Sequence, residues 1–558
     1  MSRRAQIILS NLYNIKAAGS VGGICTAAKF FLRQKEIRSH AGRETFPTKE
    51  ERERQQEEAA SFPENLKFSI LVPLYNTPET YLREMLTSVF EQTCPNWEFC
   101  LADGSDAEHG DLKEKIDAAA REYHIPEEKI RYRRLEKNGG ISENTNACLE
   151  LATGNYLVPF DHDDYLHPEV LYRYAKIILR EGADYLYCDE ATFQNDNLDD
   201  IITVHQKPDY AIDNLRANNY ICHLSCFRRS LIEEEPKIRY RFEFDGSQDH
   251  DLILRVTARA KRIVHVPKIL YYWRAHAGST ASALEEKGYA IDAAKRAVED
   301  SLLTAGIQGC TVESSKAAKN IFHIFYPIPD HPKISVILPE EGKGRIEAIR
   351  AAAGLPDLEV QFYQSGSGSR AEAMNRAAEQ AGEEYLLFLR ENVVPKDPES
   401  LRELLMYAGR SDVGAVGGCI ISHKRIESAG LVLGAGEDSI ARPYYGGWPV
   451  SSTGYMGRLC YAQDISVLSC DCMMIKKSLF EQVGGFEEGY RESGFDLDLC
   501  LRLRSMGLWN VADPYAVFEN HGKRISGYPF ESEDRGRFLN RWGDVVRGGD
   551  PFGGGNVI

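Results

Sequence analysis

The sequence predicts an α/β fold in which two tandem copies of a mostly parallel sheet follow N-terminal helices. Short apolar runs alternate with helical patterns from residue 67 onward, which is typical of parallel sheets with right-handed helical crossovers. A second series of this kind starts near residue 333, and its segments repeat those of the first in the same order. The 558 residues suffice for about two to four domains, and 43% apolar with 27% charged residues is ordinary for a globular protein.

The first 40 residues are basic and amphipathic. They carry seven Lys or Arg and one Glu, whereas the whole chain has a formal net charge of -16. Apolar residues recur there at helical spacing, so we expect a pair of helices. Two interpretations stay open: the helices lie on an anionic membrane surface, or they pack their apolar faces on the body of the protein. Residues 41–60 are rich in Glu, Arg and Gln, which predicts a solvated helix or linker.

Charge and cysteine use narrow the class of protein. We do not expect an acidic chain to bind nucleic acid. The 13 cysteines show no zinc-site spacing, which favours reduced thiols and a cytosolic protein. No apolar run reaches the roughly 18 residues of a membrane-spanning helix, and Ser10, Asn11 and Asn14 interrupt any signal-peptide core. We therefore expect a protein that is not exported.

Polar residues follow the apolar runs of the first copy, at the ends where a parallel sheet binds its ligands. They are Asn76 after the first run, Asp103 to Asp106 after the second, Asn138 to Ser142 after the third, and Asp161 to Asp164 after the fourth. These residues are the first candidates for a binding site.

The run Asp161-His162-Asp163-Asp164 is the strongest single signal. Carboxylate oxygens suit Mg²⁺ or Mn²⁺, and a cation would offset the repulsion between acids packed this closely. A metal held by one or two carboxylates usually shares its other positions with substrate phosphates. The competing interpretation is an acidic turn before the helix that starts near Pro168.

Two later motifs offer reactive side chains. Asp249 and Asp251 stand at the head of a helical pattern, where a carboxylate fits either a general base or an N-cap. Arg274 and His276 precede a loop of small residues. Arg274 fits a phosphate contact and His276 a metal ligand, although a lone histidine is more often a structural hydrogen-bonding group.

In this order and spacing the segments resemble the inverting family 2 glycosyltransferases, which have the Rossmann-like GT-A fold. The resemblance covers residues 65–280 well and residues 333–552 more loosely. It rests on SILVPLYNTPETYLREMLTSVFEQTCPNWEFCLADGSD, NGGISENTNACLELATGNYLVPFDHDD, SQDHDL and YYWRAHAGSTA. One departure is Ala102, where the family often has a second acid before the Gly-Ser pair.

The resemblance implies a role for each candidate residue. Asp249 would be the catalytic base, with Asp251 a weaker candidate. Asp161, Asp163 and His276 would bind a divalent metal, Mn²⁺ or Mg²⁺. A UDP- or dTDP-linked sugar would bind at Pro73, Tyr75, Asp103, Asn138, Gly139, Asn146 and Asp161.

The second copy is shorter and has lost acids. The first apolar run lies 77 residues before Asn146, but the matching run lies only 40 before the counterpart Asn375, a difference of 37. In the motif that matches Asp161 to Asp164, Arg390 replaces Asp161 and Asn392 replaces Asp163. The missing residues come from the half that would bind a nucleotide.

Some features of the first copy persist in the second. GFDLDLCLRL repeats SQDHDLILRV, so Asp496 and Asp498 match Asp249 and Asp251, and His521 matches the late histidine. We expect a degenerate GT-A-like domain that binds the acceptor glycan or stabilises the first domain. The alternative is a second active transferase, which would make the chain bifunctional.

The predicted organisation has four parts. Residues 1–60 form the basic helical segment and charged linker, residues 61–283 the catalytic domain, residues 284–332 a connector, and residues 333–558 the degenerate domain. The predicted function is metal-dependent, inverting transfer of a sugar from a nucleotide-diphosphate donor to a hydroxyl of a growing, lipid-linked bacterial surface polysaccharide. We expect a cytoplasmic protein, with peripheral contact to the inner face of the plasma membrane through residues 1–40.

Two alternatives belong to other functional classes. One is a non-catalytic protein that binds glycans or nucleotide sugars, since the second copy shows that acids have been lost in this chain. The other is a nucleotidyltransferase, which would need a Gly-rich basic loop near the first strand to bind a triphosphate. SILVPLYNTPET contains no Gly, Lys or Arg, so this interpretation is disfavoured.

Overall fold

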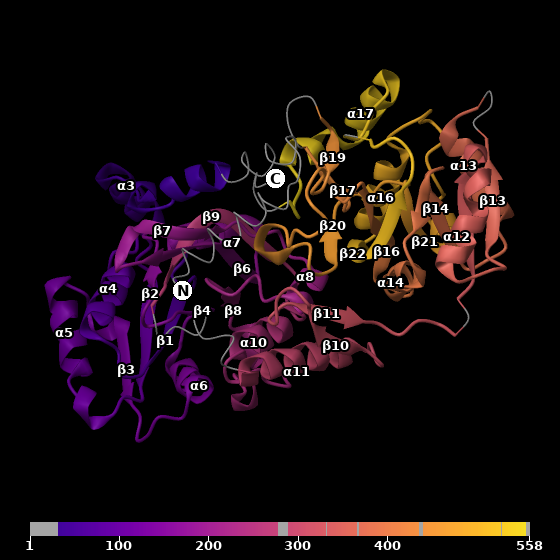
Figure 1. Cartoon of the computed structure of the whole chain (residues 1–558). Coiled ribbons are helices and arrows are strands. Elements are labelled where there is room, and N and C mark those ends of the chain that lie inside the picture. The colour runs from indigo at the N-terminus through magenta and orange to yellow at the C-terminus, as the bar shows by residue number, and fades with distance from the viewer. Residues whose placement is uncertain are drawn as a thin grey trace. The chain divides into compact units, whose positions relative to one another are not determined.

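The computed structural model describes residues 32–276, 288–330, 332–364, 368–434, 439–525 and 527–553. These residues form two compact units, drawn from indigo to magenta and from pink to yellow in Figure 1. The first unit comprises Leu32–Tyr210 and Asn218–Ile307, and the second comprises Ala211–Ala217 and the described chain from Gln308 onward. The basic segment expected at residues 1–40 lies outside the described residues up to residue 31, and residues 32–39 are helical.

A nine-stranded sheet forms the centre of the first unit. Its parallel half runs in the order β3-β2-β1-β4, and the other half continues β8-β6-β9-β5, with β7 paired to β6. The strands are β1 (Phe68–Leu74), β2 (Trp97–Asp103), β3 (Ile130–Arg134), β4 (Tyr156–Pro159), β5 (Tyr165–Leu166), β6 (Tyr185–Gln194), β7 (Asn197–His205), β8 (Cys226–Arg228) and β9 (Ile263–Arg274). β8 is antiparallel to both β4 and β6, so the sheet is mixed.

Helices cover this sheet because its central strands are apolar on both faces. Every residue of β1 and of β2 is buried, as expected of parallel strands packed between helices. Leu82, Met85 and Leu171 of the covering helices join Phe68 and Ile70 in one core. The helices are α3 (Lys49–Ala59), α4 (Glu79–Phe90), α5 (Leu112–Glu122), α6 (Ile141–Leu151), α7 (Val170–Glu181), α9 (Ser230–Glu233), α10 (Gln248–Thr257) and α11 (Gly288–Thr304).

The second unit repeats this topology. Its main sheet runs β13-β12-β14-β21-β16-β22-β15, with β17 paired to β16 and β20 to β22. The strands are β12 (Ile334–Pro339), β13 (Glu359–Tyr363), β14 (Tyr385–Leu389), β15 (Val393–Pro395), β16 (Val413–Ser422), β17 (Arg425–Ser428), β20 (Gln463–Ile465), β21 (Cys472–Lys476) and β22 (Trp509–Asn520). Two small sheets pair β10 (Thr311–Ser314) with β11 (Phe322–Phe325) and β18 (Leu431–Leu433) with β19 (Ala441–Pro443).

The 37 missing residues correspond to one strand and one helix. In the first unit α5 and β3 lie between β2 and α6, whereas in the second unit only six residues separate β13 from α13 (Arg370–Gln380). The second sheet therefore starts at the counterpart of β2. The other helices of this unit are α8 (Ile212–Ala217), α12 (Ile346–Ala353), α14 (Pro398–Ala408), α15 (Lys477–Gln482), α16 (Phe495–Ser505) and α17 (Ser532–Gly548).

The predicted fold class is confirmed: the chain contains two tandem, GT-A-like α/β sheets. The sheets are less uniformly parallel than the sequence indicates, because β8 and β21 each enter the middle of a sheet in the opposite direction. A strand's direction depends on its distant partners, which its own residues do not encode. Among the described residues, no helix combines the length and the apolar character needed to cross a membrane. The cysteines described are free thiols.

A buried ion pair joins α8 to the rest of the second unit. Arg410 donates to Asp213 Oδ1 at 2.5 Å, and both side chains are at least 95% buried. The backbone N–H of Asp213 also donates to Asp464 at 2.9 Å. These contacts attach a segment from the middle of the chain to residues about 200 positions later.

We expect Arg410→Ala to lower the free energy of unfolding of the second unit by about 3 kcal/mol, because it leaves the buried Asp213 carboxylate with only the more distant Arg216, at 3.9 Å, as a counter-charge. Urea denaturation would measure the change. Arg402→Ala is the matched control: its exposed pair with Glu399 should cost less than about 1 kcal/mol. Equal stability of the two variants would contradict this role of the buried pair.

Candidate active site

The predicted site residues gather at the carboxyl edge of the parallel strands. Because β3, β2, β1 and β4 are neighbours in this order, the segments that follow them lie along one edge. Pro73 is buried within β1, and Tyr75, just beyond that strand, is half exposed. Asn76 joins the first loop to the second through reciprocal hydrogen bonds with Asp106, at 2.8 and 3.0 Å.

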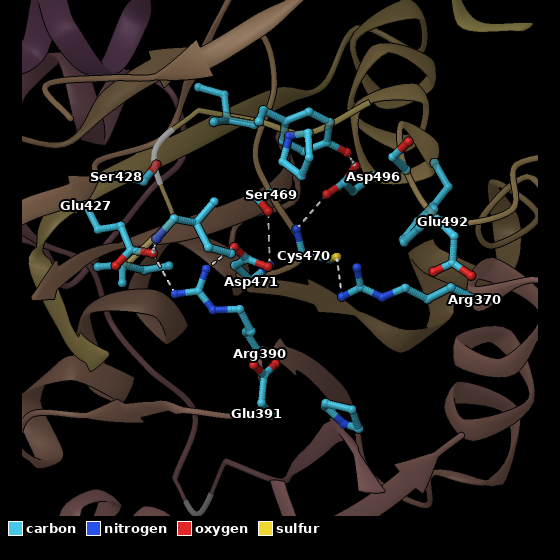
Figure 2. Close-up of a pocket in the computed structure, with 18 of the residues that line it drawn as sticks. Arg370, Arg390, Glu391, Glu427, Ser428, Ser469, Cys470, Asp471, Glu492 and Asp496 are labelled. Atoms are coloured by element: carbon cyan, nitrogen blue, oxygen red, sulfur yellow. Dashed lines mark hydrogen bonds and ion pairs between the residues drawn. The ribbon is translucent and has the colours of Figure 1, made fainter. Parts of the chain in front are cut away.

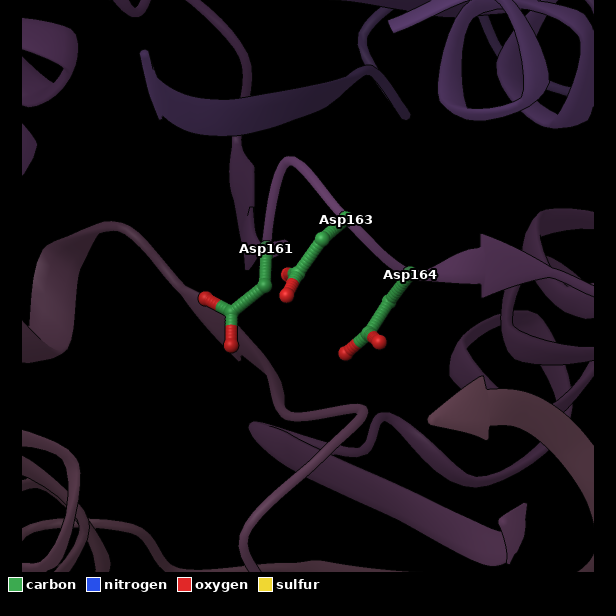
Figure 3. A group of neighbouring side chains, drawn as sticks. All are labelled: Asp161, Asp163 and Asp164. Atoms are coloured by element: carbon green, nitrogen blue, oxygen red, sulfur yellow. The ribbon is translucent and has the colours of Figure 1, made fainter. Parts of the chain in front are cut away.

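Three carboxylates meet at the turn between β4 and β5. Asp161, Asp163 and Asp164 each place an oxygen within 4.8 Å of the others (Figure 3). Burial and then the negative charge of Asp163 raise the pKa of Asp161 to about 7. Burial, with the charges of both neighbours, raises the pKa of Asp164 well above its ordinary value. These acids therefore form a compact cluster in which burial and mutual repulsion disfavour the charges of Asp161 and Asp164.

Asp164 is an anchor of this turn. Its Oδ1 accepts a hydrogen bond from the backbone N–H of Arg274 at 2.7 Å, and its Oδ2 accepts one from the Tyr271 hydroxyl at 2.5 Å. Arg274 Nε also donates to the carbonyl of Asp163 at 2.6 Å. The end of β9 thus fixes the turn, and the oxygens of Asp161 and Asp163 are left to face a ligand.

Arg274 is not placed to contact a phosphate. Its side chain is 1% exposed and forms ion pairs with Glu84 and, at 2.6 Å, with Asp196. Its guanidinium also lies 4.4 Å from the centre of the Tyr81 ring. The ion pairs of Arg274 therefore connect β9 to α4, which contains Glu84, and to the turn that contains Asp196.

Two histidines contact the free acids. His276 Nε2 lies 2.8 Å from Asp163 Oδ2, and His223 Nε2 lies 3.3 Å from Asp161 Oδ2. Burial acts to raise the pKa of Asp163, but the hydrogen bond from His276 and the charges of His162 and His276 outweigh it and lower that pKa. His276 therefore lies beside the predicted metal acids. His223 is a residue that the sequence analysis missed.

A buried lysine holds the segment that carries His223. Lys207 Nζ donates to Glu190 at 2.9 Å, to the carbonyl of Ile221 at 2.7 Å and to the carbonyl of His223. The imidazole of His223 also stacks on Tyr271, with the ring centres 4.9 Å apart. The sequence around His223 only weakly indicates a functional residue, because NNYICHLSC has no strong strand or helix periodicity.

Asp249 belongs to the same site. It is the second residue of α10, and burial raises its pKa to about 6, with the charge of His223 lowering it and that of Asp161 raising it. Asp251, the weaker candidate, is instead buried in ion pairs with Arg241 and Arg255. Asp249 is thus the acid of this motif whose pKa is affected by the charge of Asp161.

The acid cluster has the chemistry of a divalent-metal site. Asp161 and Asp163 offer hard oxygen ligands that the anchoring bonds of Asp164 do not consume, and these ligands suit Mg²⁺ or Mn²⁺. A cation there would also offset the burial and the repulsion by Asp163 that raise the pKa of Asp161. His276, in contact with Asp163, could complete the ligand set.

The predicted donor-binding residues are tied together by hydrogen bonds. Asp103 is fully buried and accepts from the Ser105 backbone at 2.9 Å and from Tyr132 and Arg134, both at 2.5 Å. Burial opposes these bonds, yet they lower the pKa of Asp103, so it stays ionised. Asp103 therefore fixes the β2 and β3 ends of the site.

Asn138 and Gly139 form a tight turn before α6. Asn138 Oδ1 accepts from the Gly140 N–H at 3.0 Å, and the Gly139 N–H donates to Asn144 at 3.1 Å. A Cβ atom on Gly139 would lie 2.8 Å from Glu143 Cβ, so a larger residue would force the turn to move. This glycine lets the backbone pass close to the helix.

Both polar atoms of the Asn146 side chain form hydrogen bonds with the protein backbone. Its Nδ2 donates to the carbonyl of Tyr240 at 2.9 Å, and its Oδ1 accepts from the Tyr240 N–H at 3.0 Å. In the second unit Asn375 makes the same pair of bonds with Phe486, both at 2.9 Å. The shared asparagine thus binds backbone in both units, independently of any ligand.

A family model matches part of the first unit. Residues 69–235 match the model described as Glycosyl transferase family 2. This part of the first unit therefore resembles a family 2 glycosyltransferase domain. The match starts in β1 and includes Asp161, Asp163 and His223; Asp249 and His276 follow it along the chain.

Two curated proteins resemble most of the chain. The Sinorhizobium fredii protein y4gI is 31% identical over 507 residues, which cover 84% of this chain and 54% of y4gI. The O-antigen biosynthesis protein RfbC of Myxococcus xanthus is 29% identical over 499 residues, which cover 81% of this chain and 37% of RfbC. The chain therefore spans about half of the first relative and just over a third of the second.

A solved structure resembles part of the chain. The crystal structure of Staphylococcus aureus TarS 1-349 in complex with UDP-GlcNAc has 23% sequence identity and a TM-score of 0.35. The alignment covers 42% of this chain and 66% of that one.

We expect Asn146→Ala and Asn375→Ala each to lower the free energy of unfolding by about 1–3 kcal/mol, because each leaves two backbone groups without their partners. Thermal or urea denaturation would measure this. Asn155→Ala, at an exposed loop position, is the control and should change stability by less than about 0.5 kcal/mol. Unchanged stability of Asn146→Ala together with a raised KM for a nucleotide sugar would favour a donor contact instead.

Proposed function

We propose that the first unit is a metal-dependent, inverting glycosyltransferase that uses a nucleotide-diphosphate sugar. One observation carries the proposal: within and just after the family 2 domain, Asp249 has a raised pKa beside the cluster of Asp161 and Asp163. Sugar transfer by a single displacement needs a general base with a pKa near neutrality and, close to it, a site that binds the diphosphate.

The acceptor that we propose is a hydroxyl of a bacterial surface polysaccharide. The support is the likeness over 81% of the chain to a protein named for O-antigen biosynthesis. A lipid-linked acceptor would agree with the basic character of residues 1–40. UDP- and dTDP-linked sugars are the donors implied by the resemblance.

In this proposal Asp161 and Asp163 hold Mg²⁺ or Mn²⁺, with His276 as a further ligand. When bound, the cation would supply a Lewis acid that offsets the charge of the departing diphosphate. Arg274 and Tyr271 keep the acids in place through Asp164. Asp103, Asn138 and Gly139 shape the loops that would receive the nucleoside.

Asp249 would take the proton from the acceptor hydroxyl. The acceptor oxygen then forms its bond to the anomeric carbon on the face opposite the leaving group, while the bond from that carbon to the diphosphate oxygen breaks. The electron pair of the broken bond leaves with the nucleoside diphosphate, and the proton stays on Asp249. This single displacement inverts the anomeric centre and needs no covalent intermediate.

The direct test is a donor screen. Purified protein with Mn²⁺ and a panel of UDP-, dTDP- and GDP-sugars should release nucleoside diphosphate from one donor, more rapidly when acceptor glycan is present. Asp163→Ala should lower this release by at least about a hundredfold, because it removes a metal ligand. Asn392→Ala, the matched position of the second unit, should release at the wild-type rate.

Retained release in Asp163→Ala would contradict the metal site. Calorimetric binding of a donor without turnover on any acceptor would favour the non-catalytic binding protein. Release that is lost in Asn392→Ala would favour two active units.

The rate should also depend on pH, since Asp249 acts as a base only when it is ionised. Its pKa of about 6 predicts that kcat/KM is nearly constant above about pH 7 and falls about tenfold for each pH unit below 6. The acidic side of the profile would be measured under donor-limited conditions with a fixed Mn²⁺ concentration. A rate independent of pH between about 5 and about 7 would contradict Asp249 as the base.

A further inference from the structure

The second unit contains a cavity of about 460 Å³ at the carboxyl ends of β12, β13 and β14 (Figure 2). This size is ordinary for a small-molecule site. By topology the cavity matches the site of the first unit, since β12 and β14 correspond to β1 and β4. The question is which ligand its lining would recognise.

The cavity has lost the means to hold a metal and a nucleotide. Arg390, which replaces Asp161, is ion-paired with Glu427 at 2.6 Å and with Asp471 at 2.8 Å (Figure 2). In the first unit, β3 and α5 extend the edge of the sheet where the nucleotide is proposed to bind. Among the described residues of the second unit these two elements have no counterparts. A diphosphate would meet several carboxylates here without a divalent metal to offset its charge.

The position of the base is also occupied. Asp496 matches Asp249, but its Oδ2 accepts from the Cys470 N–H at 3.0 Å, and its Oδ1 accepts from the Leu497 N–H at 2.9 Å and from the Tyr528 hydroxyl. These bonds leave the carboxylate engaged with the protein. The cavity therefore lies where the first unit has its candidate site, but the carboxylate at the position of the proposed base is hydrogen-bonded within the protein.

The remaining lining offers both hydrogen-bond donors and acceptors. Arg370 makes no ion pair with any described residue; its Nη2 donates to the Tyr363 hydroxyl at 3.4 Å and to Cys470 Sγ at 3.9 Å, both long contacts. Glu391 and Glu492 line the same cavity and supply acceptors. Phe495 adds a flat apolar ring, which lies 5.7 Å from the Arg370 guanidinium.

We infer that this cavity binds an uncharged sugar residue of a glycan, without a metal and without turnover. Hydroxyl groups both donate and accept, so they match a lining of carboxylates with one available guanidinium. The rings of Tyr363, Phe495 and Tyr528 would contact the apolar faces of a sugar ring. This inference does not depend on catalysis by the first unit.

Binding to the full chain in the presence of EDTA tests the inference. The probes are methyl glycosides of glucose, galactose, N-acetylglucosamine and rhamnose and their short oligosaccharides, followed by saturation-transfer NMR. We expect at least one probe to bind, and Arg370→Ala to weaken it at least about tenfold, because it removes charged hydrogen bonds. Arg376→Ala on the same helix, whose side chain pairs with Glu372 outside the cavity lining, should bind as wild type.

Several outcomes would overturn the inference. They are the absence of binding by every probe, equal loss in the Arg370 and Arg376 variants, and preferential binding of UDP to the Arg370-dependent site. If Arg370→Ala unfolds the unit, Arg370→Lys replaces it and should weaken binding several-fold, since lysine keeps the charge but loses the planar fork. Asp163→Ala should leave this binding unchanged, which separates it from failure of the proposed transferase.

Discussion

The repulsion between three carboxylates at one turn is the constraint on which the first unit depends. Asp161, Asp163 and Asp164 come from four consecutive residues, and burial makes their charges more costly. In the folded protein the three acids therefore have different roles. Asp164 receives two hydrogen bonds from β9, while Asp161 and Asp163 keep oxygens for a ligand. The neighbouring residues follow the same pattern: Tyr271 and Arg274 hold Asp164, and His276 and His223 contact Asp163 and Asp161.

The second unit shows what happens to the same scaffold when that constraint is removed. Arg390 stands where Asp161 would be, and its charge is balanced by Glu427 and Asp471 inside the unit. The sheet order is kept, and so is the asparagine that binds backbone, now Asn375. The sheet order and the asparagine that survive hold the fold, whereas Asp161 and Asp163, whose oxygens are proposed to hold a metal, are replaced by Arg390 and Asn392.

Much of the site was predictable from the sequence because its residues follow buried parallel strands. Asp103, Asn138 and Asp161 each lie just beyond an apolar run, and the edge of a parallel sheet brings such positions together. Asp249 was found through its motif, and the structure places it where the charge of Asp161 acts on it.

The rest depended on contacts between distant parts of the chain. The position of His223 is set by Lys207, and the ion pairs of Arg274 are with Glu84 and Asp196, which no local pattern reveals. The same holds for Ala211–Ala217, which pack with the second unit although they lie between strands of the first. Local periodicity predicts elements, and it does not identify their partners.

The shorter second sheet has a consequence for association between molecules. Without a counterpart of β3, β13 becomes the terminal strand of its sheet, with one row of backbone groups available for pairing with another chain. Glu359 begins this strand, and its carboxylate accepts hydrogen bonds from the Gly382 N–H at 3.0 and 3.1 Å and from Ser335. A charge fixed at that border disfavours intermolecular strand addition, so the sheet could be shortened without becoming a template for aggregation.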